Sequence, residues 1–438
     1  MPIRTIPTTS VTYALVTFDK NGSERTDDPD GSAGKLSVKI LDDITSNGYT
    51  DIFLYSHGWK GDVPAAIDQY VRWIKAIEDL DADRARMKMR VPGFKALHVG
   101  LHWPSLPFGE EEIGGAGPAF AGAAVAAPDL VGVYAARLED TPRVRAALQT
   151  IVEEARRNAA ADTLSPAARD AYVDLNDALD LGEDGVAGDP GSDRMPFDPD
   201  RAMEQGNEEG ANFAMFDLGG VLGPLRQLSF WMMKKRGRIV GESGMRAFLE
   251  DVMRAAPNAK VHLMGHSFGC VVVSSMLAGP KGNTPLVRPV DSCVLVQGAM
   301  SLWAYCHDIP AQPGTPGYCH GIIRDRKVRG PIVTTRSRFD RAVGTFYPLA
   351  AGAVGHVDFA PGAFPTFGGT GSFGLQGIAA AEDLKMLAQS GEYAFAPGGV
   401  YNLEASEFIR QGGGVSGAHS DVAGPEVAHV MWSVAAVR

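Results

Sequence analysis

The chain has 438 residues, of which 45% are hydrophobic and 21% are charged, and its formal net charge at pH 7 is −11. This composition is typical of a soluble globular protein, and the length predicts either one large domain with an insertion or two domains. An acidic chain without a sustained Lys/Arg run lacks the basic surface that nucleic-acid binding needs, and it is poorly suited to bind an anionic membrane surface.

The N-terminal sequence MPIRTIPTTSVTYALVTF has no apolar stretch followed by a small-residue cleavage site, so it predicts a first strand and not a signal peptide. The most apolar long segment, from Ile113 to Ala136, is interrupted by Pro118 and Pro128 and is therefore a poor membrane-spanning helix. These features predict a cytoplasmic protein without an integral membrane segment. The four cysteines are too few for a disulfide framework and are expected to be reduced thiols.

Short apolar runs of β-forming residues alternate with helical patterns along the chain, which favours an α/β fold with a mostly parallel sheet flanked by helices. The runs expected as strands are Val11–Phe18, Asp51–Tyr55, Ala96–Leu101, Lys260–Met264, Ser292–Val296, Ile332–Thr335 and Val400–Leu403. Three helices have a clear apolar stripe, and their expected first residues are Asp62 as an N-cap, Ser243 and Pro425.

Two regions interrupt this alternation. No convincing strand lies between Pro104 and Arg238, where helical stretches surround a segment rich in Asp, Gly and Pro. We therefore predict a core made of residues 1–103 and 239–438, with residues 104–238 inserted as a large, mainly helical cap. Residues 351–399 are rich in Gly, Phe and Pro and are expected to form a long loop near a functional site.

The clearest motif lies in the run VHLMGHSFGCVVVSSML, which contains the pentapeptide Gly265-His266-Ser267-Phe268-Gly269. This G-x-S-x-G pattern follows an aliphatic strand and precedes a helix that is expected to end at Gly279. Such a turn lifts the serine hydroxyl above the sheet edge, and its glycines are needed because a Cβ there would collide with neighbouring backbone. The alternative is a chance turn in a glycine-rich chain.

With this motif in this context, residues 35–103 and 240–438 resemble the α/β-hydrolase superfamily, of the lipase and esterase kind. The resemblance implies an α/β-hydrolase fold with Ser267 as nucleophile. A serine at its normal acidity needs a base and an orienting carboxylate, and the superfamily supplies them in the chain order Ser, Asp or Glu, His.

The resemblance implies Asp340 as the acid, because Asp340 follows the next-but-one strand after Ser267. The alternative is that Asp340 only caps a helix. Asp308 and Asp325 come too early in the chain. The implied base is His419, on the loop between the last strand and the final helix.

The other histidines fit the role of base less well. His429 lies inside the final helix, His356 precedes the last strand, and His266 adjoins the serine but is expected to point elsewhere. The histidines on or near strand ends are expected to be structural, and they are His57, His98 and His102.

The segment Ser56-His57-Gly58-Trp59 after the second strand resembles the HG-x oxyanion loop of the superfamily. The resemblance implies that the backbone N–H groups of Trp59 and Phe268 bind the oxyanion. The later run His102-Trp103-Pro104-Ser105 is similar to an uncharacterised branch of bacterial esterase-like proteins, which implies no particular substrate.

No H-E-x-x-H, C-x-x-C or Walker A pattern occurs, so we expect no metal and no cofactor. The predicted cap contains apolar side chains that either pack it onto the core or line an acyl-binding channel. They are Phe213, Met215, Phe216, Phe230, Trp231, Met232 and Met233, of which Phe230 and Trp231 are our candidates for substrate binding.

These residues together predict a carboxylic-ester hydrolase that forms an acyl-enzyme on a small-molecule or lipid ester. Amidases and peptidases share the same machinery, so the reaction class is less specific than the residues. Two alternatives stay open: a phospholipase or lipase effector that is exported without a signal peptide, and a non-catalytic binding protein on a hydrolase scaffold.

Overall fold

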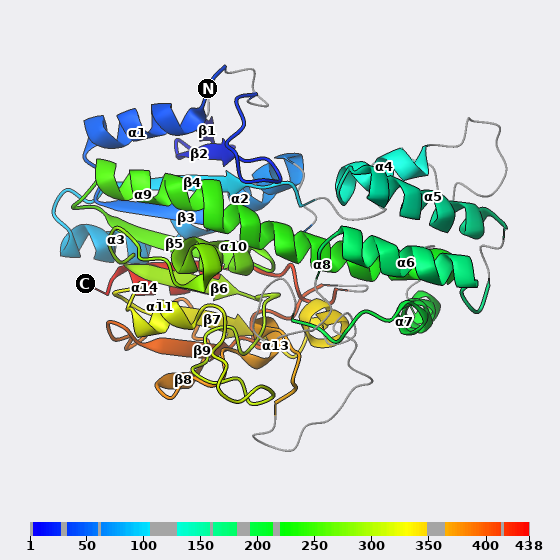
Figure 1. Cartoon of the computed structure of the whole chain (residues 1–438). Coiled ribbons are helices and arrows are strands. Elements are labelled where there is room, and N and C mark those ends of the chain that lie inside the picture. The colour runs from blue at the N-terminus through cyan, green and yellow to red at the C-terminus, as the bar shows by residue number, and fades with distance from the viewer. Residues whose placement is uncertain are drawn as a thin grey trace.

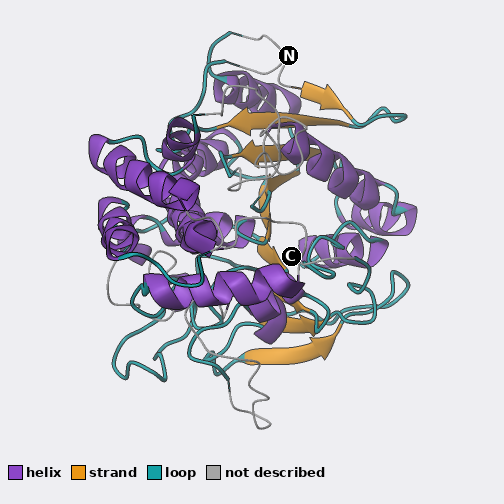
Figure 2. Cartoon of the chain, turned by 90° about the vertical axis from the view of Figure 1, so that its right-hand side faces the viewer, coloured by secondary structure: helices purple, strands orange, loops and turns teal. Residues whose placement is uncertain are grey.

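The computed structural model of the chain describes residues 3–27, 33–59, 63–105, 129–157, 161–181, 193–212, 220–347, 364–412 and 416–437. These residues form an α/β protein around a nine-stranded sheet, and Figures 1 and 2 show helices on both faces of it. The strand order is β1-β2-β4-β3-β5-β6-β7-β9-β8. Within this sheet only β1 runs antiparallel to its neighbour, so the predicted mostly parallel α/β architecture is confirmed.

All seven predicted strands are present, and their ends differ from the predicted ones by at most two residues. They are β2 (Thr12–Thr17), β3 (Asp51–Ser56), β4 (Ala96–His102), β5 (Lys260–His266), β6 (Ser292–Val296), β7 (Ile332–Arg336) and β9 (Val400–Glu404). Sequence patterns missed the two edge strands, β1 (Ile3–Thr5) and β8 (Ala381–Lys385). Both edge strands are largely exposed, so they carry no apolar run to reveal them.

The central strands are buried on both faces because side chains alternate between two cores. In β3, Ile52 and Leu54 belong to one core, whereas Phe53 and Tyr55 belong to the other. The first core is covered by helices α1 (Leu36–Asn47), α9 (Arg246–Ala255) and α10 (Gly269–Ala278). The second is covered by α2 (Val63–Glu78), α3 (Asp81–Arg90) and α14 (Pro425–Ala435).

The three predicted helices are present with differences at their starts. Helix α14 begins at Pro425 as expected. Helix α2 begins at Val63, and its predicted cap Asp62 lies outside the described residues. Within α2, Trp73 is buried, whereas Ile67 and Val71 are half-buried.

The prediction that Ser243 opens a helix is wrong. The chain runs from α8 (Gly223–Val240) through a π-helical turn, η2 (Gly241–Met245), directly into α9. The Ser243 hydroxyl donates to the carbonyl oxygen of Ile239 at 2.6 Å, so it bonds the preceding turn instead of capping the next one. A side chain that bonds backward in this way marks a kink within helical chain.

The described part of residues 104–238 holds helices and no strand. Helices α4 (Leu130–Arg137), α5 (Pro142–Arg157), α6 (Pro166–Ala178) and α7 (Pro199–Asn212) stand to one side of the sheet in Figure 1. Helix α8 contacts both α7 and α10. Because it extends from Gly223 to Val240, it crosses the predicted boundary at residue 238. A separate cap stays a prediction, and its residues Phe213, Met215 and Phe216 lie outside the described residues.

The remaining elements are short. They are the helical turns η1 (Gly220–Leu222), η3 (Pro280–Gly282) and η4 (Ala342–Phe346), with helices α11 (His320–Arg324) and α13 (Thr370–Phe373). The region 351–399, predicted as a long loop, contains both α13 and β8 in its described part. None of the helices in the described ranges is long and apolar enough to cross a membrane. All four cysteine side chains are buried, and none forms a disulfide.

Candidate active site

Ser267 lies in the tight turn between β5 and α10. Its φ angle is +55°, a left-handed conformation that residues other than glycine seldom adopt. The turn is held by three backbone hydrogen bonds, in which the Ser267 N–H donates to Val296 and the Ser267 carbonyl accepts from Cys270 and Ala299, at 3.1–3.2 Å. These bonds fix the strained residue at the carboxyl edge of the sheet.

Close backbone packing explains the glycines around Ser267. A Cβ on Gly265 would lie 2.4 Å from the carbonyl oxygen of Gly269, and one on Gly269 would lie 2.2 Å from that of Ser56. Both distances are far below van der Waals contact, which confirms the reason predicted for the two motif glycines. A Cβ on Gly58 would meet the Ser267 Cβ at 2.6 Å, so the loop after β3 packs directly against the serine.

The structure brings the three predicted residues Ser267, His419 and Asp340 into one hydrogen-bonded line. The Nε2 atom of His419 lies 2.8 Å from the Ser267 Oγ, and its Nδ1 atom lies 2.8 Å from the Asp340 Oδ2. The Asp340 side chain is fully buried, whereas that of His419 is 12% exposed. The imidazole can therefore accept a proton from the serine while the carboxylate holds its other nitrogen.

Asp340 also caps the helical turn η4. Its Oδ1 atom accepts from the N–H of Val343 at 3.0 Å, while its Oδ2 atom is the one that faces His419. The sequence left capping and orienting the histidine as alternatives for Asp340. In the structure the two oxygens perform one role each.

Backbone pairing joins the loops that carry Asp340 and His419. Asp340 forms an antiparallel bridge with Gly417, and the N–H of Ala418 donates to the carbonyl oxygen of Phe339 at 2.9 Å. Gly417 has a φ of +57°, and a Cβ there would lie 2.3 Å from the Phe339 carbonyl oxygen. This contact places His419 beside Asp340 although 79 residues separate them.

Sequence reasoning missed Gln297, which directly follows β6. Its side-chain Nε2 donates to the Asp340 Oδ2 at 2.9 Å. The position of Gln297 in the chain could have indicated its role. It follows β6, which lies between the strands that precede Ser267 and Asp340, and parallel strands end at the same edge of the sheet.

The His266 ring forms its hydrogen bond with the main chain of His419 and not with the Ser267 hydroxyl. Its Nε2 lies 2.8 Å from the carbonyl oxygen of His419 and its Nδ1 lies 3.0 Å from the amide nitrogen of Gln69. This pattern requires a neutral ring that donates through Nε2. Burial, with a smaller contribution from nearby His419, lowers the pKa of His266 well below its ordinary value, in agreement with the neutral form.

The predicted oxyanion donors lie on either side of the serine turn. The rings of Trp59 and Phe268 are in contact, with centroids 5.8 Å apart. Within the described ranges, neither backbone N–H donates to another protein atom. Both N–H groups can therefore donate a hydrogen bond to a ligand oxygen.

A network of buried polar side chains holds the loop that leads to Trp59. The Nε2 atom of His57 faces the Nδ1 atom of His102 at 3.0 Å, and the His57 Nδ1 faces the carbonyl oxygen of Gly58 at 2.8 Å. Trp103 and Ser105 donate to the carbonyl oxygens of His57 and Gly58. The H-W-P-S segment thus positions the loop.

The other polar residues weighed in the sequence have structural contacts. His98 lies between the Tyr55 hydroxyl and the Glu78 carboxylate, and His429 lies between Asp83 and the carbonyl oxygen of Gly391. Asp308 accepts from the backbone of Gly314, and Asp325 pairs with Arg324. His356 lies outside the described residues.

Of the two aromatic candidates on α8, the structure brings Phe230 to the serine turn. The Phe230 ring centroid lies 4.9 Å from that of Phe268 and 5.8 Å from that of Trp59. Trp231 is fully buried, and it packs against Tyr347 and beneath the ammonium group of Lys234. Packing alone therefore accounts for Trp231.

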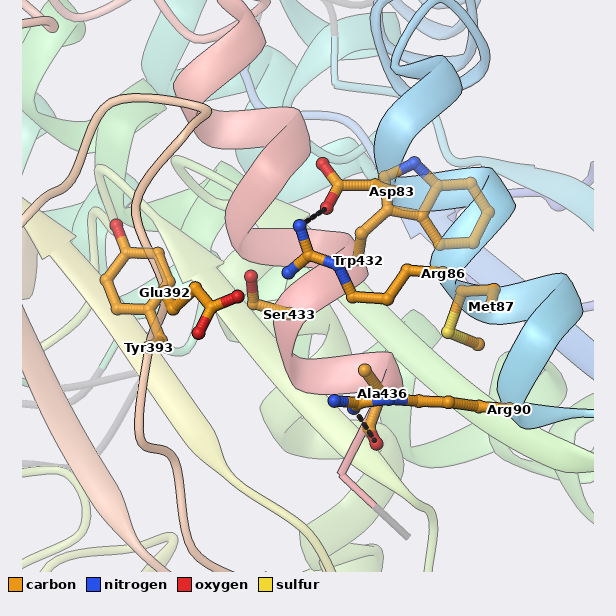
Figure 3. A pocket seen from close by; sticks show the side chains of 9 residues that line it. All are labelled: Asp83, Arg86, Met87, Arg90, Glu392, Tyr393, Trp432, Ser433 and Ala436. Atoms are coloured by element: carbon orange, nitrogen blue, oxygen red, sulfur yellow. Dashed lines mark hydrogen bonds and ion pairs between the residues drawn. The ribbon is translucent and has the colours of Figure 1, made fainter.

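A separate hollow of about 80 Å³ lies between α3 and α14 (Figure 3). Within α3, Arg86 pairs with Asp83 at 3.5 Å. Arg90 of α3 donates to the carbonyl oxygen of Ala436, just after α14, at 3.3 Å and so connects the two helices. Asp83 in turn accepts from His429. No three His, Cys, Asp or Glu side chains in the described part of the chain could hold a metal ion together.

No protein-family model matches the chain, and comparisons with curated proteins and with solved structures each returned no significant match. The functional interpretation therefore depends on the geometry of the site.

Two buried histidines predict a stability that decreases in acid. Burial lowers the pKa of both His266 and His102 well below the ordinary value, which both residues regain in the unfolded chain. Below about pH 6.5 the unfolded chain therefore binds more protons, and the free energy of unfolding falls by up to about 1.4 kcal/mol per pH unit for each histidine. Melting temperatures measured at decreasing pH should show this loss.

The variant His102→Gln tests the cause of the acid sensitivity. It should have a flatter dependence of melting temperature on pH than the wild type, because one buried titrating group is gone. His307→Gln, at an exposed position, is the matched control and should keep the wild-type slope. Equal slopes in all three proteins would contradict the prediction.

Proposed function

We propose that the protein is a serine hydrolase of the α/β-hydrolase fold that cleaves carboxylic esters through an acyl-enzyme. The observation that carries this proposal is the line of hydrogen bonds from the Ser267 Oγ through His419 to the Asp340 Oδ2. The parallel sheet, the strained turn at Ser267 and the glycines packed around it support the same interpretation.

In this mechanism Ser267 Oγ attacks the ester carbonyl while the His419 Nε2 accepts its proton. The Nδ1–H of His419 donates to the Asp340 carboxylate, which fixes the tautomer and stabilises the imidazolium. His419 then returns the proton to the leaving alcohol, and an acyl group remains on Ser267. Water deacylates the enzyme by the same two proton transfers in sequence.

The tetrahedral intermediate carries an oxyanion that needs hydrogen-bond donors. The N–H groups of Trp59 and Phe268 fit this role, because Gly58 packs against Ser267 and neither amide donates to another described residue. One such donor contributes about 3–4 kcal/mol to transition-state stabilisation in comparable enzymes. The His57–His102 network would keep the Trp59 amide in place before substrate binds.

The contact of Phe230 with Trp59 and Phe268 supports an apolar surface for the acyl or alcohol part of a substrate. Apolar contact contributes about 0.8 kcal/mol for each buried methylene group. A neutral ester with an aliphatic or aromatic substituent is therefore the substrate class that we propose.

Ser267→Ala should abolish hydrolysis of p-nitrophenyl acetate and covalent labelling by a fluorophosphonate, because both reactions need the hydroxyl. Ser275→Ala is the matched control, since this serine lies on α10 and its buried hydroxyl has no hydrogen-bond partner among the described residues. It should keep activity and labelling. Labelling that persists in Ser267→Ala would show that another residue is the nucleophile.

Asp340→Asn should lower kcat by about four orders of magnitude and His419→Ala by about six, as corresponding changes do in other serine hydrolases. The first replaces the carboxylate by an amide whose NH₂ group can favour the wrong imidazole tautomer, and the second removes the base. Steady-state kinetics on the same ester measures both, with circular dichroism to check folding. Near-normal turnover in Asp340→Asn would place the acid elsewhere.

The two aromatic residues of α8 should respond differently to truncation. Phe230→Ala should change the ratio of kcat/KM for octanoate and acetate esters, because its ring contacts the residues of the proposed oxyanion hole. Trp231→Ala should lower the melting temperature and leave that ratio near the wild-type value, since Trp231 is fully buried. An unchanged ratio in Phe230→Ala would exclude it from the acyl pocket.

A further inference from the structure

Gln297 has a backbone conformation that glutamine rarely adopts. Its φ angle is +46°, and its side chain is fully buried just beyond the end of β6. Holding a residue other than glycine in this region strains the backbone. A glycine at position 297 would relieve this strain, yet glycine stands only at the next position, 298. The chain thus has a glutamine at a position where the backbone conformation favours glycine.

The Gln297 side chain connects the Asp340 carboxylate to β7. Its Nε2 donates to the Asp340 Oδ2 at 2.9 Å, and its Oε1 accepts from the Thr335 hydroxyl at 2.9 Å. The Thr335 oxygen also accepts from the Gln297 backbone N–H at 3.0 Å. Because the only hydroxyl hydrogen of Thr335 points to Oε1, the amide NH₂ group must face the carboxylate.

Gln297 and His419 therefore donate to the same oxygen of Asp340. A donor on a carboxylate oxygen withdraws negative charge from it, and so weakens its attraction for an imidazolium. The same bond prevents the carboxylate from rotating away from His419. Among the described residues, the titratable side chains recorded in contact with the His419 ring are Asp340 and His266, and the hydrogen bonds of His266 require its neutral form.

We propose that Gln297 is a positioning residue that sets the proton affinity of His419 through Asp340, with Thr335 holding the Gln297 amide in the required orientation. This inference rests on the proposed function, in which His419 is the general base. The Gln297 side chain has its hydrogen bonds, among the described residues, with Asp340, Thr335 and Gly371 and not with the Ser267 hydroxyl. Its effect is to keep His419 less basic than an otherwise equal Asp–His pair, so that more of the imidazole is ready to accept a proton near neutral pH.

The test replaces Gln297 by methionine, which has a similar length and volume and no hydrogen-bond donor. In Gln297→Met, Asp340 Oδ2 keeps more negative charge, so the midpoint of the His419 titration should rise by about half to one pH unit. Nuclear magnetic resonance of the imidazole follows this midpoint directly. The midpoint of the acid limb in the pH profile of kcat/KM should move to higher pH by the same amount. If Gln297 had only a structural role, its replacement would lower activity without moving this midpoint.

Thr335→Val is a second variant for the case that Gln297→Met does not fold. It removes the hydroxyl that orients the Gln297 amide, so the midpoint should rise by a smaller amount. Asn402→Leu is the matched control, because Asn402 is a buried amide on β9 that bonds Leu375 and Asp383 and not Asp340. It should leave the midpoint unchanged.

The resonance titration separates this inference from the proposed function. A wild-type protein that hydrolyses no ester and reacts with no fluorophosphonate would refute the function, while the imidazole midpoint would still report on Gln297. A midpoint that stays in place or falls in folded Gln297→Met, or in Thr335→Val where Gln297→Met does not fold, would overturn the inference. A rise in Asn402→Leu equal to that in the test variant would overturn it as well.

Discussion

The buried carboxylate of Asp340 connects three loops that leave the same edge of the sheet. Its Oδ2 atom accepts from His419 on the loop after β9 and from Gln297 after β6, while its Oδ1 atom caps the turn after β7. A carboxylate without exposure to water needs such donors, because desolvation of its charge would otherwise be too costly. The same bonds that satisfy Asp340 therefore align His419 with Ser267.

Neutral polar groups surround this line and fix its geometry without adding charge. His266 holds the main chain of His419, and the contact of His57 with His102 holds the loop before Trp59. On the remaining side, Phe230 of α8 joins the aromatic pair formed by Trp59 and Phe268. Helix α8 also contacts α7, so this one helix connects the region of residues 129–212 to the serine turn.

Much of the fold could be predicted because the central strands are buried on both faces. Such strands are continuous apolar runs, and β6 was located to the residue for that reason. The edge strands β1 and β8 are short and exposed, so they leave no comparable pattern. The start of α9 was misplaced because Ser243 has the residue type of a cap but bonds Ile239 in the preceding turn.

The sequence by itself determined the serine turn, because glycine spacing is a local feature of the chain, whereas Asp340 and His419 were implied by the resemblance to a known hydrolase superfamily and by their places after later strands. Tertiary structure decided that Asp340 both caps a turn and binds His419, since that depends on where each oxygen points. It also decided the place of Gln297, which no motif marks, and it separated Phe230 from Trp231, because adjacent residues of a helix point in different directions. Contacts between residues far apart in the chain, such as the bridge between Asp340 and Gly417, form only when the sheet brings loop ends together.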